Sequence, residues 1–443
     1  MKLLLALLTF AFVNVAFAQE VEIKHSGEFR ARYLNHRNTT AQDVTASGKD
    51  ADSTDIDHRF KLNIVARKGE SLQAGLTVLH ASGWGEANDP TTGSQIPSAR
   101  DDFDDDNMLF VSRAWGWWKS NDSVSFRFGR VGLEFGDGSV FSENDWEQFP
   151  VSHDGVIGLW DINLGRFTFF GVKNRERGVG TLDNDAEENM YGIAFDFKNV
   201  PAFIKIFNIH FLQLTQDEFG SPDSSKDNRQ HLGLAIGGDT FGFIYKVAGA
   251  YQLGKTSGTA SGVPFDADNN AWMYDVLGGY QLSSLRNFKV TAGYHQDSGD
   301  KDLSDNQKNE AYNTLFYDRH NNAGLMDVLR WGNLTYWSAN ASISLLDDLD
   351  GGVSYLNFTR TSTGANVTPT VYGPNYSLSD VATNDELGSE IDAWVNKTYP
   401  SSGFQIGGRF GTFMPGDAIK QMPLAQMRDR SIYQWMLQGA LSF

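Results

Sequence analysis

Basic side chains recur on one face of segments in which apolar and polar residues alternate. Phe29, Ala31 and Tyr33 flank Arg30 and Arg32, so in an extended chain the two guanidinium groups point to the opposite side. The same alternation places Arg59, Lys61, Arg67 and Arg127 on the face opposite the apolar residues. We add Arg113, Arg130 and Arg409 as further candidates for this face. Such groups recognise anions. Alternatively, they form ion pairs with the acids that share their face, Glu28, Glu390 and Asp392.

One segment has the spacing of a phosphate-binding loop in the wrong context. Residues 249–256 match G-x-x-x-x-G-K-[ST]. Such a loop must open a helix whose N-terminal amides hold phosphate. This segment lies inside an alternating strand and runs into a Ser- and Gly-rich stretch at 257–262. We therefore reject a nucleotide site.

Other catalytic and metal-binding signatures are missing from the sequence. There is no H-E-x-x-H, no G-x-S-x-G and no Cys. The aspartates at 101–106 and the segment 266–270 lack EF-hand spacing, which favours solvated acidic loops. We expect no catalytic residue, no metal and no cofactor.

The composition favours β-structure and excludes nucleic acid as the main partner. The 443 residues include 45 Gly but only 11 Pro, and 13% are aromatic. With 37 basic against 55 acidic residues, the net charge is -18. Nucleic-acid binding instead requires a basic surplus.

The N-terminus predicts export. Met1 and Lys2 precede an apolar run at 3–13, and Ala16-Phe17-Ala18 is a small-x-small cleavage site. We expect residues 1–18 to be a cleaved signal peptide, because the run is too short for a spanning helix. Residues 19–443 then form one domain.

Candidate strands in this domain number eighteen, and short and long links alternate between them. The long links are 37–56, 83–106, 132–154, 174–187, 216–227, 253–269, 297–331, 361–386 and 415–429. This pattern predicts an all-β protein: a transmembrane antiparallel up-and-down barrel with short periplasmic turns and long extracellular loops. Closure pairs every backbone group, as hydrocarbon requires. The 35-residue link 297–331 is the candidate for an inward-folded plug.

The last residue, Phe443, ends an alternating aromatic strand. It resembles the terminal signal by which bacterial outer-membrane barrels are recognised for insertion. This resemblance implies outer-membrane lipids, periplasmic chaperones and the barrel-assembly machinery as partners.

In such a barrel the basic set would line the lumen. An Arg on the lipid face near the midplane costs about 2–4 kcal/mol, so the lumen is the cheaper location. Rings of Arg and Lys favour anions in a pore. The predicted pore-lining residues are Arg30, Arg32, Arg59, Lys61, Arg67, Arg113, Arg127, Arg130, Glu390, Asp392 and Arg409.

Three stretches resemble the alginate-export family of outer-membrane barrels. They are Gly129-Arg130 with 135–138, Trp146 and 153–155; 314–320 continuing to 324–327; and 387–392 with 413–416. The resemblance implies an eighteen-stranded channel, which in some members exports an anionic polysaccharide through an Arg- and Lys-lined pore.

The sequence therefore predicts a porin-like outer-membrane channel for small anionic or polar solutes. Two alternatives remain open: a dedicated exporter of an acidic polysaccharide such as alginate, and an outer-membrane hydrolase, although no motif points to the latter.

Overall fold

The computed structural model describes residues 21–38, 53–84, 108–177, 186–219, 224–260, 263–302, 305, 307–318, 320, 322–363, 384–420 and 430–443. The expected signal peptide, the aspartate run at 101–106 and parts of most predicted long links lie outside these residues. Within them, no helix is both long enough and apolar enough to span a membrane.

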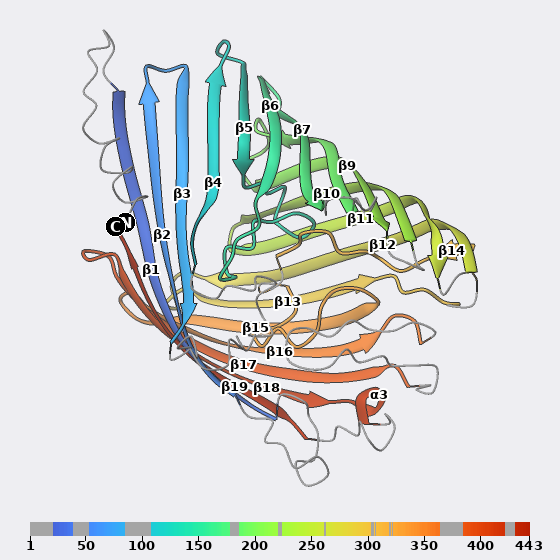
Figure 1. Ribbon diagram of the computed structural model, residues 1–443. Helices are drawn as coiled ribbons and strands as arrows, with labels where there is room; N and C mark the ends of the chain where they lie inside the picture. The colour runs from blue at the N-terminus through green and yellow to red at the C-terminus, as the bar shows by residue number, and fades with distance from the viewer. Residues whose placement is uncertain are drawn as a thin grey trace, which may run out of the picture.

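The strands join into one closed cylinder. β1 (Val21–Arg37) pairs antiparallel with β19 (Ile432–Ser442), which places the two ends of the sheet side by side (Figure 1). The other wall strands are β2 (Ser53–Lys68), β3 (Leu72–Gly83), β4 (Met108–Lys119), β5 (Val124–Val131), β6 (His153–Ile162), β7 (Gly165–Arg177), β8 (Ala186–Phe197), β9 (Ile204–Phe219), β10 (Ser224–Thr240), β11 (Phe243–Ala260), β12 (Val263–Leu282), β13 (Phe288–Asp297), β15 (Leu334–Leu346), β16 (Leu349–Arg360), β17 (Glu386–Tyr399) and β18 (Phe404–Pro415).

Two small elements lie outside the wall. β14 (Lys308–Asn309) pairs parallel with β12, and α3 (Asp417–Lys420) follows β18. In the described part of the chain the wall therefore has eighteen antiparallel strands, which confirms the predicted barrel.

The two faces of the wall are inverted relative to a soluble protein. On β1, Phe29 and Tyr33 are 40% and 39% exposed, whereas Arg30 and Arg32 are only 5% and 2% exposed. The same holds around the ring: large apolar side chains cover the outside, and polar side chains are buried inside. An apolar outer surface of this extent requires an apolar surrounding.

Two predicted long links are mostly strand. β9 and β10 stay paired up to Phe219 and Ser224, and β11 and β12 up to Ala260 and Val263. Polar residues predominate in the segments 216–227 and 253–269, which is why the sequence predicts loops there. The rejected phosphate-loop motif lies inside β11, in agreement with the sequence argument.

Two segments from the long-loop end fold into the cylinder. One is 132–152, between β5 and β6; the other comprises the described residues of 298–333, between β13 and β15 (Figure 1). They join each other through the Phe141–Phe316 bridge and through the Asp318 amide, which donates to the Gly138 carbonyl. The second segment lies in the predicted plug link. Nothing in the period-two pattern indicated the first.

Candidate functional site in the lumen

Basic side chains of β1 and β2 hold the inward segment 132–152 against the wall. Arg59 Nη1 donates to the carbonyls of Asp145 (2.8 Å) and Glu147 (2.7 Å). Arg32 Nη2 donates to the Trp146 carbonyl (2.7 Å), and Arg30 donates more weakly to the same turn. These predicted pore-lining arginines thus face the lumen, where they bind the chain's own backbone.

A carboxylate reinforces this attachment. Asp145 pairs with Lys61 at 2.9 Å and with Arg59 at 3.4 Å, and Arg59 also pairs with Glu28 at 2.6 Å. Burial alone would raise the pKa of the Asp145 carboxyl. The nearby Arg59, Lys61 and Arg30 cations outweigh this effect and hold the pKa below its ordinary value.

The indole of Trp146 lies at the meeting point of both inward segments. The His320 ring stacks on it at 3.7 Å between centroids, with an interplanar angle of 7°. The guanidinium groups of Arg32 and Arg409 lie 3.8 and 4.3 Å from the indole centroid. Arg409 also donates to His320 Nε2. This Arg–Trp–His cluster links β1 and β18, which are separated in the wall by β19 alone, to both inward segments.

The predicted acids on β17 hold the second inward segment. Glu390 Oε1 accepts from the Met326 amide at 3.1 Å, and Asp392 Oδ2 accepts from the Leu325 amide at 3.3 Å. Both carboxylates are fully buried. Instead of pairing with a wall cation, they bind backbone amides of residues 325 and 326.

The sequence analysis did not predict a further group of charged side chains on β11 to β13 that faces the inward segments. Lys246 pairs with Asp275 (2.8 Å) and with Asp137 of the first inward segment (3.0 Å). On β13, Asp297 accepts from the amides of Gly332 and Leu334 at 2.8 Å each. The inward position of Lys246 in an alternating strand was the signal that could have identified it.

Arg67 and Arg127 lie differently from the other predicted cations. They line one cavity of about 550 Å³ near the short-turn end, formed by β2 to β7. Within the described residues, neither forms an ion pair; Arg127 lies 4.9 Å from the centroid of Trp115. Arg113, by contrast, is paired with Glu143 of the first inward segment at 2.7 Å.

Arg130 does not face the lumen, contrary to the expectation from sequence. It forms a bidentate pair with Asp154, at 2.8 and 2.7 Å, on the same side of the sheet as the exposed Phe128 and Val156. Side chains two apart share a face, so Arg130 follows Phe126 and Phe128 outward. It avoids the cost of a lipid-facing charge because it is close to the strand's end and paired.

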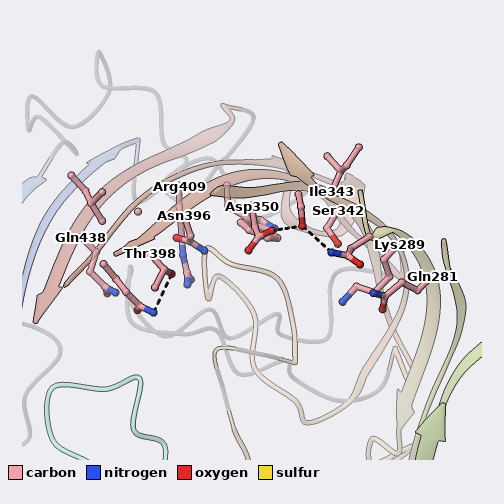
Figure 2. Close-up of a pocket in the computed structure, with 15 residues that line it drawn as sticks. Gln281, Lys289, Ser342, Ile343, Asp350, Asn396, Thr398, Arg409 and Gln438 are labelled. Atoms are coloured by element: carbon pink, nitrogen blue, oxygen red, sulfur yellow. Dashed lines mark hydrogen bonds between the residues drawn. The ribbon is translucent and has the colours of Figure 1, made fainter. Parts of the chain in front are cut away.

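A second cavity, of about 480 Å³, lies near the short turns of β12 to β19. Its lining is mainly neutral and polar, with five carboxamides: Gln281, Asn287, Asn396, Gln405 and Gln438. Figure 2 shows Asn396, Thr398 and Arg409 on neighbouring strands, all facing this cavity. The two cavities place a basic and a carboxamide surface on different parts of the inner wall.

Comparison with known proteins agrees with this architecture. The family model described as "Alginate export" matches residues 29–432. The chain is similar to the crystal structures of Pseudomonas aeruginosa OccK8 (OprE), with 15% identity, a TM-score of 0.57 and coverage of 95% of this chain and 98% of that chain. It is also similar to the crystal structure of Acinetobacter baumannii OccAB1, with 12% identity, a TM-score of 0.59 and coverage of 95% of this chain and 96% of that chain. A third similar structure is Pseudomonas aeruginosa OpdK with vanillate, with 11% identity, a TM-score of 0.59 and coverage of 95% of this chain and 98% of that chain. No curated protein sequence matches the chain significantly.

Proposed function

Because this chain belongs to the alginate-export family of bacterial outer-membrane barrels, we propose that it is a passive channel for small anionic or polar solutes. The long loops then face outward from the cell, and the short turns face the periplasm. Solutes cross by diffusion, without a cofactor and without a catalytic step.

The pair Arg67 and Arg127 carries this proposal. Most other lumen cations are occupied by the inward segments, whereas these two form no ion pair within the described residues, although Glu70, Asp122 and Asp161 line the same cavity. A mobile anion would be the natural partner of two such guanidinium groups. Asp122 and Asp161 are already paired with Lys119 and Arg166, so Arg67 and Arg127 leave this part of the lumen with a small positive surplus, although the protein is acidic overall.

The interlocked inward segments support passage of small solutes rather than bulky ones. They fill much of the lumen with buried side chains, including Phe141, Tyr317 and Trp331. The OpdK structure, which has the same fold, contains vanillate, a small organic anion.

Planar-bilayer recordings test the proposal. Under a salt gradient, the wild-type channel should conduct with a reversal potential that indicates anion preference. Replacing Arg67 and Arg127 by Gln should shift the reversal potential toward zero, the value of a pore that does not select between anions and cations. Arg130→Gln is the matched control, because Arg130 faces outward, and it should leave the potential unchanged.

Two results would count against this function. One is a folded barrel without measurable conductance. The other is a preference for cations that the Arg67→Gln/Arg127→Gln variant leaves unaltered.

The family match also favours a second candidate, export of an acidic polysaccharide. A chain of anionic sugars would have to displace the Trp146–His320 contact to pass. An acidic oligosaccharide should then block the pore from the periplasmic side, and Arg113→Gln and Arg127→Gln should weaken this block. Indifference of the conductance to the oligosaccharide would remove this candidate.

The remaining partners belong to the same proposal. We propose that residues 1–18 direct export and are removed, and that periplasmic chaperones and the barrel-assembly machinery deliver the chain to the membrane. Phe443, exposed on the outer face, supports the latter. Hydrolytic activity on lipid or peptide in detergent would instead favour an outer-membrane enzyme.

A further inference from the structure

A compact patch of polar side chains around one tryptophan lies on the inner wall of three adjacent strands, β15, β16 and β17. It lines the second cavity, of about 480 Å³, and consists of Ser342, Ser344, Asp350, Trp394 and Asn396. In the strand register, Ser342 and Trp394 flank one position of β16, while Ser344 and Asn396 flank Asp350 two residues closer to the short turns. We refer to these five side chains as the Trp394 patch.

The Trp394 patch has the dimensions of a single sugar ring. Neighbouring strands lie about 4.8 Å apart, and two residues along a strand span about 6.6 Å. Three strands and two rows therefore cover roughly 10 Å by 7 Å of the inner wall. The cavity in front of the patch is large enough for a small solute, since ligand pockets typically measure about 300–1,000 Å³.

Gly352, the position of β16 between Ser342 and Trp394, leaves room for the indole. A Cβ at Gly352 would lie 2.7 Å from Trp394 Nε1 and 2.8 Å from Cε2, so the ring packs directly on the backbone of β16. Within the described residues, no aromatic ring or guanidinium group stacks on this indole. The rest of the half-buried ring borders the cavity. Such an apolar ring surface can pack against the C–H groups on one face of a sugar.

The polar members of the patch offer donors and acceptors that the chain itself does not use. The side chains of Ser342 and Asn396 form no hydrogen bond within the described residues, and Figure 2 shows both facing the cavity. Asp350 Oδ1 accepts from the Ser344 hydroxyl at 2.8 Å, which leaves Oδ2 to a solute. A sugar hydroxyl can donate to the Asp350 carboxylate and both donate to and accept from the Asn396 carboxamide.

The charges around the patch favour a neutral sugar over an acidic one. Asp350 lies within the patch, where its carboxylate repels anions. Lys289 on β13 and Arg409 on β18 border the patch on either side. Arg409 is engaged with the inward segments, because its guanidinium group lies 4.3 Å from the Trp146 indole centroid. The remaining charges, those of Lys289 and Asp350, cancel.

We propose that the Trp394 patch is a binding site for a neutral pyranose sugar. One face of the sugar ring packs on the Trp394 indole, and the hydroxyl groups bind Ser342, Asp350 and Asn396. This inference rests on the proposed channel function, and it names one class of polar solute that the channel takes. Because the patch lies near the short turns, it holds the sugar at the periplasmic end of the lumen.

Saturation-transfer NMR tests this site on the full chain, folded in micelles of lauryldimethylamine oxide, a detergent without a sugar headgroup. Glucose at millimolar concentration should receive saturation from the protein, most strongly at its ring C–H protons. Mannitol, an open-chain polyol of nearly the same mass, should give a much weaker signal because it has no ring face. Glucuronate should also give a weaker signal than glucose, because its carboxylate meets Asp350.

Two variants examine the role of the indole. Trp394→Ala should lower the affinity for glucose roughly fivefold, the loss expected for one ring contact. Gly352→Ala should weaken binding as well, because the added Cβ displaces the indole without removing it. Trp117→Ala is the matched control, since Trp117 lines the basic cavity instead, and it should bind glucose like the wild type. Heat-modifiable migration in gels establishes that each variant is folded.

The proposal is overturned if mannitol or glucuronate gives a signal as strong as that of glucose, or if Trp394→Ala binds glucose like the wild type. These measurements do not depend on conductance. A chain that conducts with anion preference but does not bind glucose loses this site and keeps the channel function. A chain that binds glucose but does not conduct keeps the site and loses the channel function.

Discussion

The arginines of β1 and β2 donate mainly to neutral acceptors. Arg30, Arg32 and Arg59 bind backbone carbonyls of residues 145–147. A carboxylate accepts a stronger hydrogen bond from a guanidinium group than a carbonyl does. An anionic solute in the lumen therefore competes with the chain's own backbone for these donors.

At the level of single residues, acid should loosen the first inward segment. The pKa of Asp145 is lower in the folded protein than in the unfolded chain. Its stabilisation is therefore complete above the ordinary Asp value of about 3.9 and is lost as the pH falls through the lower folded value. Single-channel conductance should rise over this acid range in the wild type. Asp145→Asn should show the higher conductance already at neutral pH and no further rise with acid.

A glycine on the second segment gives another test. Gly324 has a φ of +93°, and a Cβ there would lie 2.1 Å from Glu390 Oε1. Gly324→Ala should cost about 1–3 kcal/mol of local strain and release the segment from β17, which enlarges the conductance. Gly278→Ala is the control, since its Cβ would meet nothing within 4 Å. Equal conductance in both variants would contradict the role of Glu390 as an anchor.

At the level of elements, the two inward segments stabilise each other through Phe141. Its fully buried ring lies 5.2 Å from Phe316 and 5.1 Å from His153, between centroids. Phe141→Ala should cost about 3–5 kcal/mol of packing and separate the segments. Because the wall hydrogen bonds remain, the barrel should still migrate as a folded species in unheated gels while its conductance increases. Phe169→Ala, an outward-facing change, should leave the conductance as it is.

Period-two alternation predicts the wall of this protein well and its interior poorly. Phe29 and Tyr33 face outward and Arg30 inward because a strand imposes that geometry. Arg59 pairs with Glu28, as the ion-pair alternative anticipated, but Arg30 and Arg59 also donate to backbone carbonyls, whose position no residue type reveals. The apolar residues Phe135 and Phe141, inside a link expected to be polar, were the available sign of an inward segment.

At the level of the whole molecule, the last residue closes the seam of the cylinder. The Phe443 ring stacks on Phe60 at 6.3 Å between centroids, and a Cβ at Gly27 would lie 2.4 Å from this ring. Phe443→Ser should reduce the amount of barrel in the outer membrane several-fold if the terminal aromatic is recognised during assembly. Refolding in detergent distinguishes lost recognition by the assembly machinery from lost packing at the seam. A variant that also fails to refold in detergent has lost the packing.

The length of β9 to β12 has a consequence for the outside of the cell. These strands contain 16, 17, 18 and 20 residues, whereas about 9–11 are enough to cross a bilayer. Their surplus lies at the long-loop end, so the β9–β10 and β11–β12 hairpins project above the membrane. Among the described residues, the β11–β12 hairpin is therefore the part that an antibody or a bacteriophage would meet first on an intact bacterium.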